Sequence, residues 1–161
     1  MIPELGHFAL ILALGMAVTQ AIFPLAGSFT HNRAWMAMAR PLAWGQFVFT
    51  AIAFACLLQA FLTDDFSVAY VQTNSNTLMP TLYKVSAVWG AHEGSLLLWA
   101  AFMAAWGAAV ASFSSNLPQQ MIARVLSVMG MIAIGFLLFM LLTSNPFERL
   151  YQVLADGQLR V

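Results

Sequence analysis

His92 and Glu93 form the only adjacent imidazole and carboxylate in the sequence, within VWGAHEGSLLLW at residues 88–99. An imidazole titrates near neutral pH, and a carboxylate beside it can orient a donor or hold a positive charge. Two interpretations follow: the pair meets a substrate, or it forms hydrogen bonds within its own glycine-rich turn. Trp89 and Trp99 flank the pair and add flat apolar surfaces to either arrangement.

A helix through this stretch would gather its aromatic rings on one side. At about 100° per residue, one narrow face carries the imidazole at its start and two indole rings along it, with Glu93 on the flank. Such a face would suit a flat, apolar, partly charged ligand such as a porphyrin. It would equally suit an aromatic belt that packs against a neighbouring helix. The residues of this face are His92, Ser95, Trp99, Met103 and Trp106.

Other chemistry-bearing residues are few. His7, His31 and His92 share no helical turn with one another, so they make a poor metal site. The sequence contains no G-x-S-x-G, no P-loop and no H-E-x-x-H. Cys56 is the single cysteine, so no disulfide forms within the chain, and no C-x-x-C-H marks a c-type cytochrome. The net charge is zero, which leaves no basic surface for nucleic acid.

The elements that position these residues are predicted to be membrane-spanning helices. Of the 161 residues, 61% are hydrophobic and 7% are charged, and the mean hydropathy is +0.82; soluble domains carry about 25% charged residues. A span needs about 20 apolar residues, and a helix satisfies its own backbone groups in lipid. We therefore expect an all-α, polytopic membrane protein. Its four predicted spans are 5–25, 42–62, 94–113 and 121–142, and a long loop covers 63–93.

Basic residues are distributed unevenly among the connections. The two short connections hold or adjoin Arg33, Arg40 and Arg124, whereas the long loop holds Lys84 alone. The positive-inside rule then puts the short connections in the cytoplasm, and the amino terminus, long loop and tail outside. Two arginines in the tail, one of them Arg160, make the number of basic residues outside equal to the number inside.

The length of the third apolar segment predicts a bend at its start. A continuous helix over residues 84–113 would measure about 45 Å, against about 30 Å of hydrocarbon. Gly90 and Gly94 would permit the bend. His92 and Glu93 would then lie at the outer interface, where a carboxylate avoids most of the about 2.5–3.5 kcal/mol that a central charge costs.

Seven strings carry a specific pattern across nearly the whole chain. They are DFSVAYVQTNSNT (65–77), LMP (78–80), YK (83–84), WGAHEGSLLLW (89–99), ARVLSVMGM (123–131), GFLLF (135–139) and TSNPF (143–147). This pattern resembles the CcmF family, the haem lyase subunit of the bacterial system that matures c-type cytochromes. The long loop and the W-G-A-H-E-G-S string are its most specific parts.

The resemblance implies a multi-pass protein of the bacterial inner membrane with a periplasmic amino terminus, in agreement with the charge distribution. In the family, haem arrives from a CcmE-type periplasmic chaperone, and CcmH-type partners present the reduced apocytochrome c. Haem is then joined through thioether bonds to the C-x-x-C-H cysteines. The resemblance therefore predicts haem handling and ligation, with haem, these proteins and the lipid bilayer as partners and no nucleic acid.

The sequence also departs from the family pattern. Residues 1–161 resemble only the family's amino-terminal part, and the tryptophan-rich signature W-G-G-x-W-x-W-D is absent. The family's haem-ligating histidines map onto none of His7, His31 or His92. The resemblance therefore carries over no haem ligand, no catalytic residue and no metal site, and it leaves enzyme activity open. Because the family continues beyond Asp156, we expect a truncated or frameshifted member, a split gene or a cut chain.

The outer loop supplies candidate haem-adjacent residues beside the string at residues 89–99. Asn74, Asn76, Tyr83 and Lys84 would line the face where haem and apocytochrome meet, and Lys84 could pair with a haem propionate. The alternative for Lys84 is an interfacial lysine that snorkels to water, and asparagines commonly form turns. The sequence leaves both interpretations open.

Two other functions also fit the sequence. A scaffold subunit would use its spans to hold other helices and would touch no haem. A small respiratory subunit that anchors haem b or quinone would need inward histidines on facing helices, and His7 and His92 both lie towards the outer side. A Soret band that is lost in a His92→Ala variant would favour direct haem contact over the scaffold.

Overall fold

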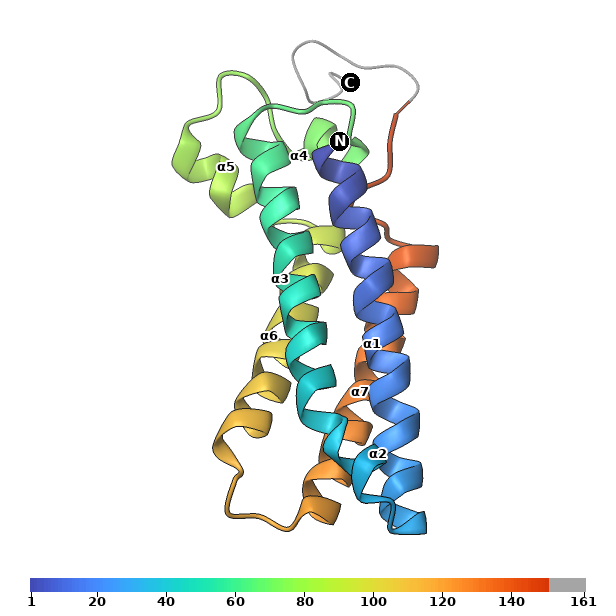
Figure 1. Ribbon diagram of the computed structural model, residues 1–161. Coiled ribbons are helices and arrows are strands. Elements are labelled where there is room, and N and C mark those ends of the chain that lie inside the picture. Colours follow the sequence, from blue (N-terminus) through green and yellow to red (C-terminus); the bar gives the residue numbers. More distant parts are fainter. Residues whose placement is uncertain (151–161) are drawn as a thin grey trace.

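The computed structural model describes residues 1–150 and shows four long helices side by side, joined by short helices and turns (Figure 1). It confirms the all-α fold, with no β-strand among these residues beyond one isolated bridge. The tail beyond residue 150, with Arg160 and the segment after Asp156, lies outside the described part. The long helices are α1 (Ile2–Thr30), α3 (Ala39–Leu62), α6 (His92–Phe113) and α7 (Gln119–Leu142). The short helices are α2 (Arg33–Ala37), α4 (Ala69–Asn74) and α5 (Thr81–Ala87).

The long helices are sufficiently long and apolar to cross a membrane. They contain 22 to 29 residues, which corresponds to about 33–44 Å of helix. Each contains one of the four predicted spans and extends beyond it, because helix formation does not stop at the edge of the hydrocarbon. The first connection, expected over residues 26–41, is consequently short: His31 ends α1 with a left-handed φ of 56°, and the Asn32 side chain caps α2.

α1 packs between α3 and α7, and α6 packs against α3. The contacting faces are rich in alanine and glycine, which lets the backbones approach closely, as is usual where lipid supplies no hydrophobic drive between helices. A Cβ on Gly130 would lie 3.0 Å from the Ala17 carbonyl oxygen. The Gln20 amide crosses the same contact and donates to the Leu126 carbonyl at 2.7 Å. α1 and α7 are therefore joined by both close packing and a buried hydrogen bond.

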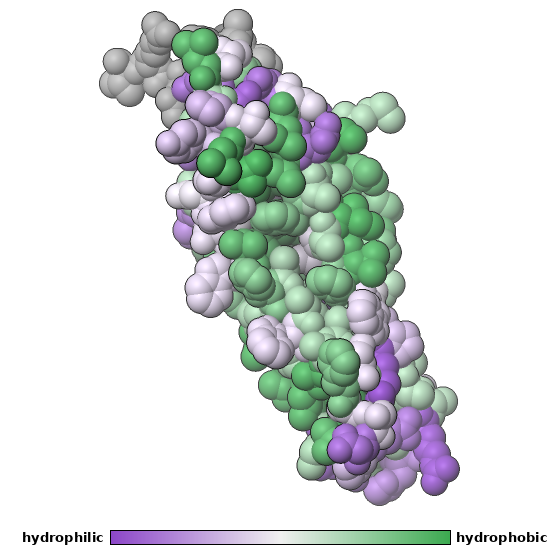
Figure 2. Space-filling view, turned by 90° about the vertical axis from the view of Figure 1, so that its left-hand side faces the viewer, coloured by the Kyte–Doolittle hydropathy of each residue, from purple (hydrophilic) through white to green (hydrophobic). Residues whose placement is uncertain are grey.

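The two ends of the bundle differ in charge. Every Asp and Glu among residues 1–150 lies at the end formed by the start of α1, α4, α5 and the turns around them, which we call the loop end. The opposite end, the basic end, holds Arg33, Arg40 and Arg124. Figure 2 shows hydrophilic residues gathered at both ends and hydrophobic residues around the middle. This pattern is the one expected of a bundle whose middle lies in lipid.

Candidate functional site at the loop end

A tight turn at residues 88–91 separates α5 from α6 and contains the expected bend. The Tyr70 hydroxyl donates to the Val88 carbonyl at 2.9 Å and accepts from the Ala91 N–H at 3.3 Å. The ring of Tyr70 packs edge-on against Phe61, with centroids 5.4 Å apart. Burial raises the pKa of Tyr70 above its ordinary value, so the hydroxyl keeps its proton at neutral pH. α4 and α3 thus hold the turn that precedes α6.

Gly94 is required at the first turn of α6 for space. A Cβ at this position would lie 1.6 Å from the Val88 carbonyl oxygen and 2.5 Å from the Tyr70 hydroxyl oxygen. Both glycines were expected to supply conformational freedom for the bend. Instead, neither Gly90 nor Gly94 has a positive φ, and the bend depends on the missing side chain of Gly94.

His92 is held by a residue that follows α7. Its Nδ1 lies 3.2 Å from the Ser144 hydroxyl oxygen, and its ring meets Phe139 edge-on at a centroid distance of 6.0 Å. Within residues 1–150 its Nε2 has no hydrogen-bond partner, and the side chain is exposed. Glu93 is half-buried on the flank and does not bond to His92. The adjacent pair is therefore split, and the imidazole alone faces outward.

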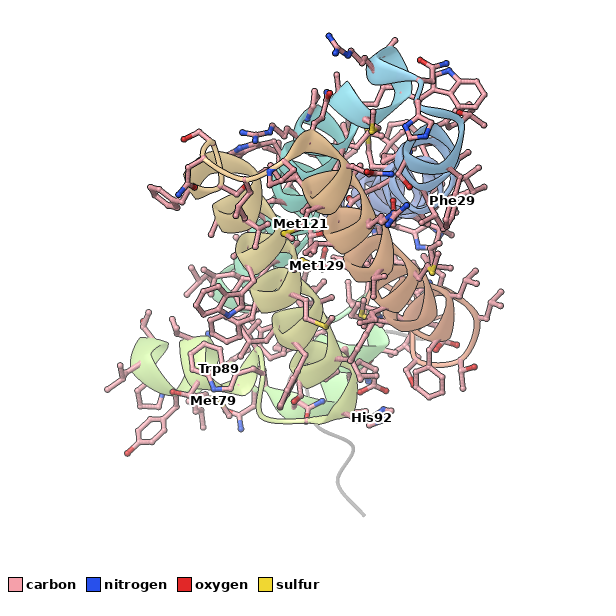
Figure 3. All side chains as sticks on the ribbon, turned by 90° about the horizontal axis from the view of Figure 1, so that it is seen from below. Phe29, Met79, Trp89, His92, Met121 and Met129 are labelled. Carbon is pink, nitrogen blue, oxygen red and sulfur yellow. The ribbon has the colours of Figure 1, made fainter. Side chains whose placement is uncertain are left out.

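His92 lines an open groove between α6 and α7, which we call the aromatic groove. Its volume is about 500 Å³, within the usual range of about 300–1,000 Å³ for small-molecule sites. An apolar hollow of about 390 Å³ adjoins it and shares two lining residues, Leu96 and Phe136. Figure 3 shows Trp89 and His92 from below the bundle. The lining residues are Trp89, Gly90, Ala91, His92, Ser95, Leu96, Trp99 and Phe136.

The aromatic groove confirms part of the predicted helical face. His92, Ser95 and Trp99 line it together, and Trp99 leaves 61% of its surface exposed. Trp106 continues the same face beyond the groove and is 69% exposed. The opposite wall comes from Phe136 of α7, which the sequence analysis did not identify because no local spacing links α7 to α6.

The predicted residues of the long loop do not converge on the aromatic groove. Lys84 is buried and pairs with Asp64, its Nζ lying 2.6 Å from the carboxylate. The Asn74 amide donates to the Tyr70 carbonyl at 2.9 Å, and Asn76 accepts from the Leu78 N–H at 3.0 Å. Both asparagines therefore stabilise local turns. The exposed residue of the loop set is Tyr83 on α5.

The segment after α7 contacts both histidines of the loop end. The Asn145 side-chain oxygen accepts from the Phe147 N–H at 2.9 Å, which leaves its NH₂ group to donate to His7 Nδ1 at 3.1 Å. His7 thus carries its proton on Nε2 when neutral. The neighbouring Ser144 holds His92. Both partners lie in the TSNPF string, whose repeated small polar residues are the one signal that could have indicated them.

An ionic contact ties the same segment to the start of α1. Arg149 Nε donates to the Glu4 carboxylate at 2.8 Å, and an Nη nitrogen lies 3.6 Å from Asp65. Backbone bonds join the segment to the loop after α3, with Ala69 N–H donating to the Glu148 carbonyl at 2.8 Å. His31 lies at the other end of the bundle, and residues 1–150 contain no cluster of three metal-ligating side chains.

Comparisons with known proteins point to one family. Residues 89–159 match the family model described as cytochrome C assembly protein. The chain is similar to the cytochrome c-type biogenesis protein CcmF of Pseudomonas aeruginosa, with 64% identity over 98% of the chain and 24% of the relative. Identity to CcmF of Escherichia coli is 51% over 92% of the chain and 23% of the relative. The solved structure of the cytochrome c heme lyase CcmF matches with a TM-score of 0.87 and 28% identity, over 92% of this chain and 25% of that one. The chain therefore spans about a quarter of the length of these relatives.

Proposed function

Because the chain belongs to the CcmF family, we propose that it handles haem in cytochrome c biogenesis, as one part of a larger haem lyase assembly in the bacterial inner membrane. Its relatives carry the names cytochrome c-type biogenesis protein and heme lyase. The four apolar helices are consistent with a multi-pass membrane protein. The relatives are about four times longer than this chain, so the proposal is limited to the surfaces that this chain itself provides.

The aromatic groove is the single observation that carries this proposal. Haem is a flat apolar substrate with two propionates on one edge, and the groove offers Trp99 and Phe136 as apolar walls. His92 lines the same groove with its Nε2 available to donate or accept a hydrogen bond. With one imidazole lining the groove and no cluster of three metal-ligating side chains among residues 1–150, we assign this site to orienting haem and assign its ligation to the remainder of the assembly.

The proposed role of the groove in thioether formation is positional. In that reaction a cysteine S–H adds across a haem vinyl group, so sulfur bonds to one carbon, the proton goes to the other, and no oxidant is consumed. A site that holds the porphyrin plane favours this addition through orientation. Trp99 and Phe136 would hold the plane, and the bond from Ser144 would fix the direction of the His92 ring.

The loop end is the part that we propose to face the periplasm. The three arginines of the opposite end support this orientation, because basic residues favour the cytoplasmic side. A CcmE-type haem chaperone, CcmH-type proteins and apocytochrome c would then approach the aromatic groove and Tyr83. Lys84 would hold α5 in place through Asp64, and a propionate contact would require it to leave that partner.

The test is covalent haem attachment to a cytochrome c in a strain that lacks the lyase. The chain is expressed together with the remaining part of the family protein, with Trp99→Ala or with Trp106→Ala as the matched control. Both indoles are exposed on α6, and only Trp99 lines the groove. We expect Trp99→Ala to lower covalent haem and Trp106→Ala to leave it unchanged. Equal activity of the two variants, in strains whose maturation still depends on the chain, would favour the scaffold function instead.

A further inference from the structure

We propose that the basic end binds the headgroup of an anionic phospholipid, at a site formed by Arg33, Arg124, Phe29 and Trp35. This inference is independent of the proposed haem function, because the site lies at the end of the bundle opposite the aromatic groove. It concerns the contact of the chain with its membrane.

Arg124 is held in a fixed position one and a half turns into α7. Its Nε donates to the Ser28 hydroxyl at 3.2 Å, and its guanidinium carbon lies 5.0 Å from the centroid of the Phe29 ring. The two Nη groups have no partner among residues 1–150, and the side chain is exposed. A guanidinium stacked on an aromatic ring with free Nη donors suits bidentate contact with a phosphate. The contact with Ser28 supplies the orientation in advance.

Arg33 lies on the neighbouring short helix and has no side-chain partner in the described part of the chain. The Gln119 side chain at the start of α7 donates to the Arg33 carbonyl at 3.4 Å, and Gln120 donates to the Ser28 carbonyl at 2.8 Å. These bonds hold α2 and the end of α1 against the first turn of α7. The two arginines are therefore carried by one packed corner of the bundle.

The same corner exposes aromatic rings that suit acyl chains. Phe29 is 67% exposed and lies at the periphery of the bundle in Figure 3. Trp35 is 37% exposed and meets Phe23 edge-on, with centroids 5.3 Å apart. Tryptophan is favoured at the level of lipid headgroups, and basic pockets between spans bind anionic headgroups. Aromatic rings and guanidinium groups at one corner match the apolar and charged parts of a phospholipid.

Charge selects an anionic lipid over a zwitterionic one. Among residues 1–150 no carboxylate lies at the basic end to neutralise these arginines. Arg40 differs, because it donates to the Ala111 carbonyl at 3.0 Å and the Ser114 carbonyl at 3.3 Å, at the end of α6. Its guanidinium thus binds the carbonyl groups at the negative, carboxyl-terminal end of α6. Arg40 is therefore a matched control from the same end.

The experiment measures lipid binding to the purified chain by native mass spectrometry. Phosphatidylglycerol and phosphatidylcholine with identical acyl chains are compared for the natural chain and for the variants Arg33→Gln, Arg124→Gln and Arg40→Gln. Removing one basic residue near an anionic lipid is expected to lower the affinity about fivefold, and removing both Arg33 and Arg124 in one double variant about 30-fold. We expect these losses for phosphatidylglycerol with Arg33→Gln and Arg124→Gln, and a loss below about twofold with Arg40→Gln.

Three results would overturn the proposal. They are equal affinity for the two lipids, equal losses for all three arginine variants, and displacement of phosphatidylglycerol by millimolar inorganic phosphate, which would indicate a site for free anions. Arg33→Gln disturbs no packing contact, so its result stands even where Arg124→Gln unfolds. Arg124→Lys adds a second check, because it keeps the charge and is expected to retain more affinity than Arg124→Gln.

Discussion

Replacing Gly94 with alanine is predicted to displace the turn that carries the candidate site. The new Cβ would lie 1.6 Å from the Val88 carbonyl oxygen and 2.8 Å from the carbonyl carbon. These atoms are backbone and cannot rotate away as the end of a side chain would. The turn must move, and the hydrogen bond from the Tyr70 hydroxyl to Val88 is lost with it.

The cost has two parts. Forcing a methyl group into a packed position costs typically about 1–3 kcal/mol, and a lost hydrogen bond adds about 1 kcal/mol. We therefore expect Gly94→Ala to lower the free energy of unfolding by about 2–4 kcal/mol. Gly15→Ala is the matched control, because its Cβ meets nothing within 4 Å, and alanine is favoured over glycine within a helix by about 0.5–1 kcal/mol.

Thermal unfolding of the purified chain in detergent, followed by tryptophan fluorescence, measures both variants. Hydrogen exchange of residues 84–95 then locates the change. We expect exchange in this segment to be faster in Gly94→Ala and unchanged in Gly15→Ala. Unchanged stability and unchanged exchange in Gly94→Ala would refute the reasoning, because the turn could then not be packed as described.

Three further predictions concern contacts of the loop end. Tyr70→Phe should lower the free energy of unfolding by about 1–2 kcal/mol. Because burial raises the pKa of this hydroxyl above its ordinary value of 10, its contribution is present below pH 10 and is lost as the pH rises further. Denaturant titration across this range should show a larger loss of stability in the natural chain than in Tyr70→Phe. Lys84→Met leaves Asp64 unpaired and should lower the free energy of unfolding by about 1–3 kcal/mol, less than for a fully buried pair because Asp64 is partly exposed. The control is Tyr83→Ala on the exposed side of α5, which should unfold at the same denaturant concentration as the natural chain. Asn145→Ala removes the donor to the histidine of α1 and should speed hydrogen exchange over residues 143–150, whereas unchanged exchange would show that this bond does not hold the segment.

The sequence was sufficient to predict four long apolar helices, because lipid imposes a long, continuous apolar requirement that local composition reveals. It also located the turn before α6 from the excess length of the segment. The predicted first span, 5–25, already included Pro24, which a membrane helix tolerates, but the sequence did not predict that α1 would continue to Thr30. The charge pattern indicated two unlike ends, and the structure shows the same division among residues 1–150.

The candidate site was only partly predictable. His92 and Trp99 follow from helical spacing, which is a local property, and the structure puts both in the aromatic groove. The partners Ser144 and Phe136 come from α7 and the segment after it, and no local pattern sets the register between two helices. Lys84 illustrates the same limit, since its partner lies 20 residues earlier in the chain.

We propose that the loop end, with its aromatic groove, faces the extracytoplasmic compartment. Single-cysteine variants test it most directly: Tyr83→Cys at the loop end and Arg33→Cys at the basic end, both with the natural Cys56 replaced by alanine. Spheroplasts are treated with a maleimide that cannot cross the membrane. We expect labelling of Tyr83→Cys in intact spheroplasts and of Arg33→Cys only after permeabilisation. The reverse pattern would place the groove in the cytosol and contradict the proposed encounter with haem and apocytochrome c.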